Sequence, residues 1–155
     1  MVDNLFKRNE MVFLLYCFVQ TTTNSHLRVL QKIKDKISTT KKDAYYAIIS
    51  KLLLYENEDL SPDIFSFYFE EASKGIYSQS PVSRTKCISI LSYFSRINLE
   101  PILPLIPVLQ KMCKDDYWEL KGQLLILCSN ALLYFHTVEE EIEFENEQIV
   151  ETSNE

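Results

Sequence analysis

The stretch Pro101–Pro107 reads PILPLIP, with three prolines at a strict spacing of three residues. Two interpretations compete: an exposed polyproline ligand, or the rigid start of a buried helix. The first four N–H groups of a helix have no intrahelical acceptor, so prolines within this turn remove no backbone hydrogen bond. A helix that begins at Pro104 would make Pro107 its fourth residue and leave Pro101 in the preceding turn. The large apolar residues between the prolines favour this buried helix.

Composition extends the helical interpretation to the whole chain. It has 155 residues, 46% of them hydrophobic, which is enough for the core of one domain. Gly75 and Gly122 are the only glycines, against an average usage of about 7%. Neither a Gly-rich phosphate loop nor a G-x-S-x-G nucleophile turn can be written with these two residues. We therefore predict an all-α fold.

Cap signals divide the sequence into helices. Ser61-Pro62 and Ser80-Pro81 each place a capping serine before a proline at the first helical position. The predicted helices span 4–20, 25–38, 41–55, 61–75, 81–97, 102–114 and 117–136. The short connections between them are typical of antiparallel helix pairs.

The helices repeat one another at the period of a helix pair. Apolar residues stand three, four, six and seven positions after Arg84, and the same offsets after Lys121, thirty-seven residues later, are also apolar. Leu60-Ser-Pro62 likewise recurs as Leu99-Glu-Pro101. The chain is thus predicted to stack similar helix pairs, each covering apolar surface of its neighbour.

Ser80–Lys114 resembles a HEAT repeat of the armadillo-like class. Its first helix has the form S-P-x-x-R-x-x-C-I-x-I-L, its second helix contains L-P-x-I-P-x-L, and Asp115 closes it. Ser83 departs from the valine common in such repeats. The helix from Asp116 resembles the start of a next repeat, and 41–75 fits more loosely. The resemblance implies a right-handed α-solenoid of about three helix pairs plus a terminal helix over residues 1–138.

Both ends of the chain need separate interpretation. Met11–Val19 is an apolar run behind Lys7 and Arg8, but it is too short for the ~20 residues of a membrane span and lacks a signal cleavage site. We predict a buried helix there and a soluble, cytoplasmic protein. Residues 139–155 hold eight glutamates and no lysine or arginine, so the net charge of -6 belongs to this segment, predicted to be a flexible acidic tail.

The sequence favours no enzymatic activity. The four cysteines (Cys17, Cys87, Cys113 and Cys128) lie far apart in apolar segments and predict buried, reduced thiols rather than a disulfide frame or a zinc site. Glu70 and Glu71 are the nearest thing to a catalytic acidic pair in the body, but adjacent helix positions point in different directions, so they predict a solvated face. We expect no catalytic residue, no metal and no cofactor.

Apolar surfaces favour a protein partner. The second helix at 61–75 is apolar all round, and so is the start of the one at 102–114, which indicates either burial on two sides or a hydrophobic groove. The helix at 117–136 is apolar on nearly every face, so it needs a cover: the tail, a second copy or a partner chain. Candidate partner-binding residues are Phe65, Phe67, Tyr68, Phe69, Leu125, Leu132 and Phe135. The leading hypothesis is a non-enzymatic scaffold, adaptor or complex subunit.

A basic amphipathic helix supports an alternative function. Segment 26–42 exposes lysines and arginine opposite an apolar face, and Arg28, Lys32, Lys34 and Lys36 are candidate residues for binding phosphoinositide or an acidic peptide. An anionic membrane surface is thus open as a partner. Nucleic acid is disfavoured because the net charge is negative. Direct tubulin binding is disfavoured because the turns within the helix pairs, 56–59 and 97–100, are acidic or neutral, whereas HEAT-like tubulin binders use basic and aromatic ones.

Overall fold

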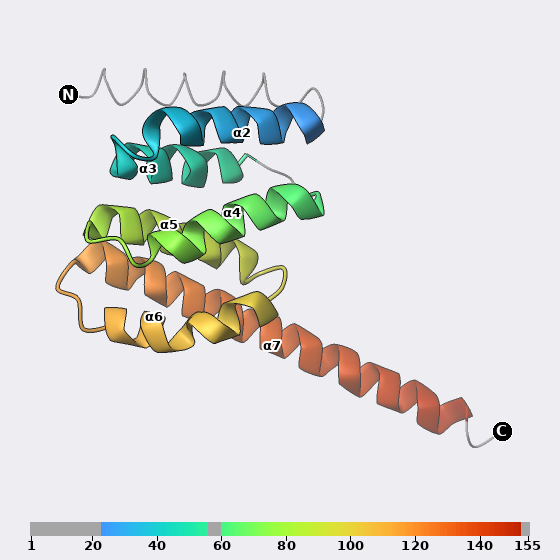
Figure 1. Ribbon diagram of the computed structural model, residues 1–155. Coiled ribbons are helices and arrows are strands. Elements are labelled where there is room, and N and C mark those ends of the chain that lie inside the picture. Colours follow the sequence, from blue (N-terminus) through green and yellow to red (C-terminus); the bar gives the residue numbers. More distant parts are fainter. Residues whose placement is uncertain (1–22, 56–59, 153–155) are drawn as a thin grey trace. The chain divides into compact units, whose positions relative to one another are not determined.

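The computed structural model describes residues 23–55 and 60–152 of the chain. Every element within these residues is helical, which confirms the predicted all-α class. In chain order the elements are α2 (Thr23–Ile37), α3 (Lys42–Leu53), α4 (Pro62–Gly75), α5 (Pro81–Phe94), the 3₁₀ helix η1 (Glu100–Leu105), α6 (Ile106–Met112) and α7 (Trp118–Thr152) (Figure 1). The predicted helix at 4–20 lies outside the described residues, as does the turn at 56–59.

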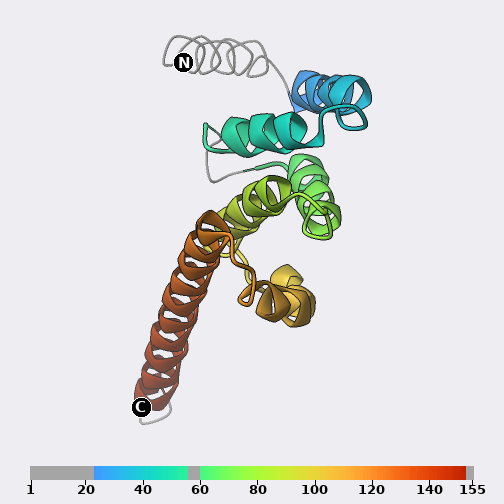
Figure 2. The same cartoon turned by 90° about the vertical axis from the view of Figure 1, so that its left-hand side faces the viewer.

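The chain divides into two compact units, and the boundary between Leu91 and Ser92 falls within α5. The first unit holds α2, α3, α4 and most of α5, and α2 contacts both α3 and α4. The second unit holds the end of α5 together with η1, α6 and α7. Within it α7 is a long rod that extends well beyond α6 (Figure 2).

Two helices of the first unit begin at the predicted serine–proline pairs. Pro62 opens α4 after Ser61, and Pro81 opens α5 after Ser80. Proline suits this position because the first N–H of a helix has no intrahelical acceptor. The backbone N–H of Ser83 donates a hydrogen bond of 3.4 Å to the Ser80 hydroxyl, which caps α5. These starts are therefore fixed by local chemistry.

The core of the first unit is aliphatic and aromatic. Its largest fully buried side chains on α2, α3, α4 and the following turn are Leu30, Tyr45, Ile49, Leu52, Leu53, Tyr68 and Ile76. Packing is close around Gly75 at the end of α4. A Cβ atom at this position would lie 2.6 Å from the Tyr46 ring of α3 and would also collide with the Cys87 sulfur of α5. Glycine is therefore needed here for close approach of three helices.

Gly75→Ala should destabilise the protein by about 2 kcal/mol, because the added methyl group overpacks the contact with Tyr46 and Cys87. Gly122→Ala is the matched control. Nothing lies within 4 Å of a Cβ at Gly122, so this change should instead stabilise α7 by about 0.5–1 kcal/mol through helix propensity. Urea unfolding followed by circular dichroism measures both. Equal shifts in the same direction would refute the packing argument.

The prediction of a single α-helix at 102–114, beginning at Pro104 with Pro101 in the preceding turn, is wrong. Residues 100–105 form η1, which contains Pro104, and α6 begins only at Ile106 with Pro107 in its first turn. A 3₁₀ helix has three residues per turn and bonds each N–H to the third residue back. A proline at every third position is compatible with both 3₁₀ and α-helical turns, so the spacing alone did not distinguish them.

The apolar residues of η1 and α6 are only partly buried. Ile102 and Leu109 lie in the core, whereas Leu103 and Ile106 are 44% and 41% exposed. The expected burial of the whole run is thus wrong for these two residues. A helix of seven residues, such as α6, can turn only one narrow face toward the core.

The last helix, α7, is much longer than predicted. It continues for 35 residues to Thr152, so the predicted helix end near 136 is wrong, and the boundary at 139 is not the end of an element. The acidic segment lacks glycine and proline, and glutamate is a good helix former, so nothing in it stops the helix. That residues 139–155 are flexible stays a prediction.

Candidate functional site

The main candidate site is the exposed face of α7. Trp118, Leu125 and Leu132 follow one another at intervals of seven residues and are 74%, 71% and 70% exposed. Gly122 and Ser129 stand between them and His136 follows Leu132, and these three residues are also seven apart. A spacing of seven is close to two helical turns, so all six positions form one stripe along the helix. We call these six residues the α7 seam.

The opposite side of α7 is packed. Leu120, Leu124 and Leu127 are buried. The side chain of Asn130 donates a hydrogen bond of 2.8 Å to the backbone carbonyl of Ser92, and the Ser92 hydroxyl donates to the carbonyl of Gln123 at 3.5 Å. Because α7 already has this packed side, the seam is a second apolar surface. Ile126, Leu133, Phe135 and Ile142 flank it and are exposed.

The structure separates the candidate partner-binding residues into three groups. Leu125, Leu132 and Phe135 are exposed on α7, where a partner can reach them. Phe65, Phe67 and Phe69 on α4 are half-buried. Tyr68 is fully buried, so the prediction that it lies on a binding surface is wrong. Helix α4 packs one side into the core of the first unit, and Tyr68 points to that side together with Ile64 and Ala72.

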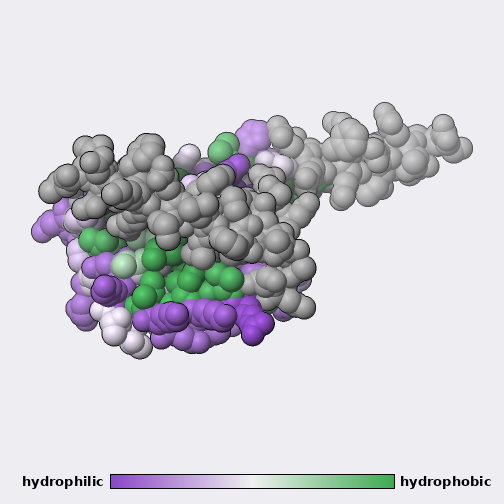
Figure 3. All heavy atoms as spheres, turned by 90° about the horizontal axis from the view of Figure 1, so that it is seen from above, coloured by the Kyte–Doolittle hydropathy of each residue, from purple (hydrophilic) through white to green (hydrophobic). Residues whose placement is uncertain are grey.

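The candidate anion-binding residues on α2 also divide. Arg28, Lys32 and Lys36 are exposed and four residues apart, so they form one row. The α2 side of the first unit shows a hydrophilic band beside a hydrophobic area (Figure 3), as an amphipathic helix would give. Lys34 does not belong to this row. Its ammonium group lies 2.8 Å from the Glu71 carboxylate, so it is already engaged within the protein, and that it binds an external anion stays a prediction.

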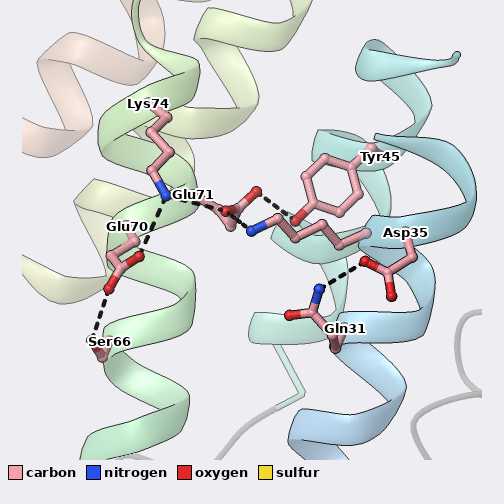
Figure 4. A network of polar contacts seen from close by, with 8 residues as sticks. Gln31, Asp35, Tyr45, Ser66, Glu70, Glu71 and Lys74 are labelled. Atoms are coloured by element: carbon pink, nitrogen blue, oxygen red, sulfur yellow. Dashed lines mark hydrogen bonds and ion pairs between the residues drawn. The ribbon is translucent and has the colours of Figure 1, made fainter. Parts of the chain in front are cut away.

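Glu71 is the centre of a buried polar network that sequence reasoning missed. It is 5% exposed, although the sequence predicted a solvated carboxylate. The Tyr45 hydroxyl donates a hydrogen bond of 2.7 Å to it, and the more distant Lys74 ammonium lies at 3.8 Å (Figure 4). Burial and this carboxylate raise the pKa of Tyr45. The network ties α2, α3 and α4 together, and its groups already satisfy one another.

A second polar feature lies between the start of α3 and the α4–α5 loop. Thr40–Ala44 and Tyr77–Ser80 line an open cavity of about 640 Å³. Asp43 lies in its wall and accepts a hydrogen bond of 2.6 Å from the Ser83 hydroxyl. Hydrogen bonds from Ser80 and Ser83 lower the pKa of Asp43. This carboxylate also stands in the first turn of α3, where it stabilises the positive end of the helix dipole. The cavity thus has a structural carboxylate in its wall.

The cysteines are less buried than predicted. Cys87 is buried, and burial raises the pKa of its thiol, but Cys113 and Cys128 are exposed, so the prediction is wrong for these two. Cys17 lies outside the described residues. Within residues 23–55 and 60–152, no three His, Cys, Asp or Glu side chains come together in a way that could hold a metal ion.

Comparisons with known proteins add no assignment. No helix in the described part of the chain combines the length and apolar character required to cross a membrane. The chain matches no model of a protein family, no curated protein and no solved structure. The resemblance to HEAT repeats therefore stays a prediction that rests on the sequence, and the α7 seam is the observation from which function has to be argued.

Proposed function

We propose that this chain is a non-enzymatic, HEAT-like helical-repeat scaffold of the cytoplasm, acting as an adaptor or as a subunit of a larger assembly. Its function is to bind protein through the α7 seam. Three large apolar side chains of the seam, Trp118, Leu125 and Leu132, are each at least 70% exposed on one stripe of one helix. This is the observation that carries the proposal.

The chemistry of the seam favours a helix as the bound element. Contiguous exposed apolar patches of this kind commonly mark interaction sites. A straight stripe with a seven-residue repeat matches the side chains of a second helix packed along it, and it offers no free sheet edge for an extended strand. The small residues Gly122 and Ser129 allow the bound helix to approach closely. The half-buried phenylalanines of α4 are a secondary contact candidate.

Site-specific photo-crosslinking in the native cells tests this proposal. A photoreactive amino acid at position 125 should crosslink to a peptide that mass spectrometry places in a helix of the bound protein. The matched control carries the same group at Thr137, an exposed polar position on α7, and Leu132→Glu in the position-125 variant should remove the product. Equal labelling from positions 125 and 137, or no product from either, would refute seam-mediated binding.

The alternative function is an adaptor that binds anions through α2. The exposed row of Arg28, Lys32 and Lys36 supports it, but Lys34 is engaged by Glu71, so the site has one cation fewer than the sequence indicated. Cosedimentation with vesicles that contain phosphoinositide tests this function. Binding that survives Arg28→Glu, Lys32→Glu and Lys36→Glu together would exclude it.

A further inference from the structure

The α7 seam has a counterpart in the preceding repeat, and that counterpart is covered. Thirty-seven residues before Gly122, Leu125, Ser129 and Leu132 stand Thr85, Ile88 and Ser92 of α5 and Ser95 directly after it. All four of these residues are at most 4% exposed. Part of this face, at Ser92, is in hydrogen-bond contact with α7 itself. The equivalent positions are therefore buried in and after α5, whereas on α7 Leu125 and Leu132 are exposed.

Large and small residues alternate along the seam from Trp118 to Leu132, and the larger His136 follows. Trp118, Leu125 and Leu132 project from α7, whereas Gly122 and Ser129 leave hollows between them. At Gly122 the space is empty, since nothing lies within 4 Å of a Cβ placed there. The large side chains act as knobs and the small residues leave holes. A helix that packs on this surface must therefore present small residues opposite the large ones.

We infer that the seam binds the seam of a second copy of this chain, with the two α7 helices antiparallel. In this register Leu125 of each copy packs against Ser129 of the other and Leu132 packs against Gly122. Trp118 and His136, which are both large, meet side by side at the two ends of the contact. The two residue numbers of each pair average 127, so all three pairs lie symmetrically about the level of residue 127. A single two-fold axis at that level therefore relates the two copies in every pair. The inference rests on the proposed function of the seam and names its partner.

A parallel arrangement fits the same surface poorly. It would place Gly122 opposite Gly122 and Leu125 opposite Leu125, so that holes would face holes. It would also bring together the ends of α7 that contain seven glutamates and no lysine or arginine between residues 139 and 152. The antiparallel arrangement separates these two acidic segments and sets the helix dipoles in opposition. Charge and shape therefore select the same orientation.

Filling the hole tests the interdigitation directly. Light scattering on the wild-type chain at roughly 100 µM should give twice the monomer mass of 18.2 kDa. Gly122→Leu should leave the monomer folded, because nothing lies within 4 Å of a Cβ at this position, but it should raise the dimer dissociation constant tenfold or more by overpacking against Leu132. Unspecific hydrophobic association, or a parallel dimer, would instead be strengthened by this added leucine.

A compensating variant keeps the test independent of folding defects. Gly122→Leu combined with Leu132→Ala moves the knob to the other side of the seam, and it should regain the dimer that Gly122→Leu loses. Circular dichroism on each variant checks that the helices are retained. A wild-type chain that stays monomeric at roughly 100 µM, or a Gly122→Leu variant that dimerises as well as the wild type, would overturn the inference.

The two exposed cysteines provide a second readout. Cys128 lies beside the seam one residue from the proposed two-fold level, so the two copies of its thiol approach each other, whereas Cys113 follows α6 and is not part of α7. In a Cys17→Ser background, a short bifunctional maleimide should crosslink the dimer. Cys128→Ser should abolish this crosslink, and Cys113→Ser should retain it. The opposite pattern would exclude the proposed register.

The photo-crosslinking experiment distinguishes the two proposals. A product in which position 125 is joined to α7 of the same chain supports both. A product with a helix of a different protein, from a chain that is monomeric in light scattering, supports the proposed function and overturns the self-association. The absence of any seam-dependent product overturns both.

Discussion

Lys34→Met should destabilise the protein by about 3 kcal/mol, because it leaves the buried Glu71 carboxylate without its close cation. Glu71 is 5% exposed, and Lys34 is its nearest positive charge at 2.8 Å. The Tyr45 hydroxyl continues to donate one hydrogen bond but carries no charge. The variant also loses the contact of the Lys34 ammonium with the Phe67 ring, 5.8 Å from the ring centre. Chemical unfolding followed by circular dichroism measures the loss.

Lys74→Met is the matched control, since Lys74 faces the same carboxylate from 3.8 Å but is 63% exposed. Solvent screens such a pair, so its removal should cost less than about 1 kcal/mol. The double variant Lys34→Met with Glu71→Gln should recover most of the stability, because the neutral amide still accepts the Tyr45 hydrogen bond and leaves no buried charge. Similar losses for Lys34→Met and Lys74→Met would show that the network is not what holds α2, α3 and α4 together.

Helix positions could be predicted from the sequence wherever the signal is local. The starts of α4 and α5 follow from Ser61-Pro62 and Ser80-Pro81, and both begin at the predicted proline. The prediction of the start of α6 failed because a proline at every third residue is compatible with both α-helical and 3₁₀ turns. The prediction of the end of α7 failed because the glutamate-rich segment 139–155 indicated a solvated tail, although glutamate has a high helix propensity.

Side-chain burial was harder to predict because it depends on neighbouring helices. Glu71 looked solvated beside Glu70, and its ion pair comes from Lys34 on α2, far away in sequence. A signal was present: Glu71 shares a helix face with Tyr68, Ala72 and Gly75, all of which are buried. A carboxylate within such an apolar stripe predicts a buried pair, and a lysine outside the row of Arg28, Lys32 and Lys36 is the candidate partner.

The α7 face illustrates the same limit for the candidate site. The sequence predicted that this helix has more apolar surface than one packed side can bury, and that Leu125 and Leu132 lie in it. It did not indicate which stripe stays open, because that is decided by the packing of Leu120, Leu124 and Leu127. The residues at intervals of seven can be recognised as an exposed stripe only once this packed side is known.

The contribution of His26 to the free energy of unfolding should fall by about 2 kcal/mol between pH 7 and pH 5. This side chain is buried on α2, edge-on to the Tyr68 ring with ring centres 6.4 Å apart. Burial lowers the pKa of His26 from 6.5 to about 4, since the charged imidazolium is poorly solvated there. In the unfolded chain His26 takes up a proton as the pH falls below 6.5, whereas in the folded chain it stays neutral until about pH 4. The stabilising contribution of neutral His26 is therefore fully present above pH 6.5, and it is lost as the pH falls toward 4.

His26→Phe isolates this contribution, because phenylalanine keeps a ring against Tyr68 and cannot bind a proton. Urea unfolding at pH 7 and pH 5 should give the variant a stability difference about 2 kcal/mol smaller than that of the wild type. The measurement at pH 7 separately reports any packing change, since little of the protonation effect is present there. Parallel pH profiles for the two proteins would show that His26 is charged, or solvated, in the folded state. That result would contradict the burial of the His26 side chain between α2 and α4. It would also contradict the close packing of these two helices around Tyr68.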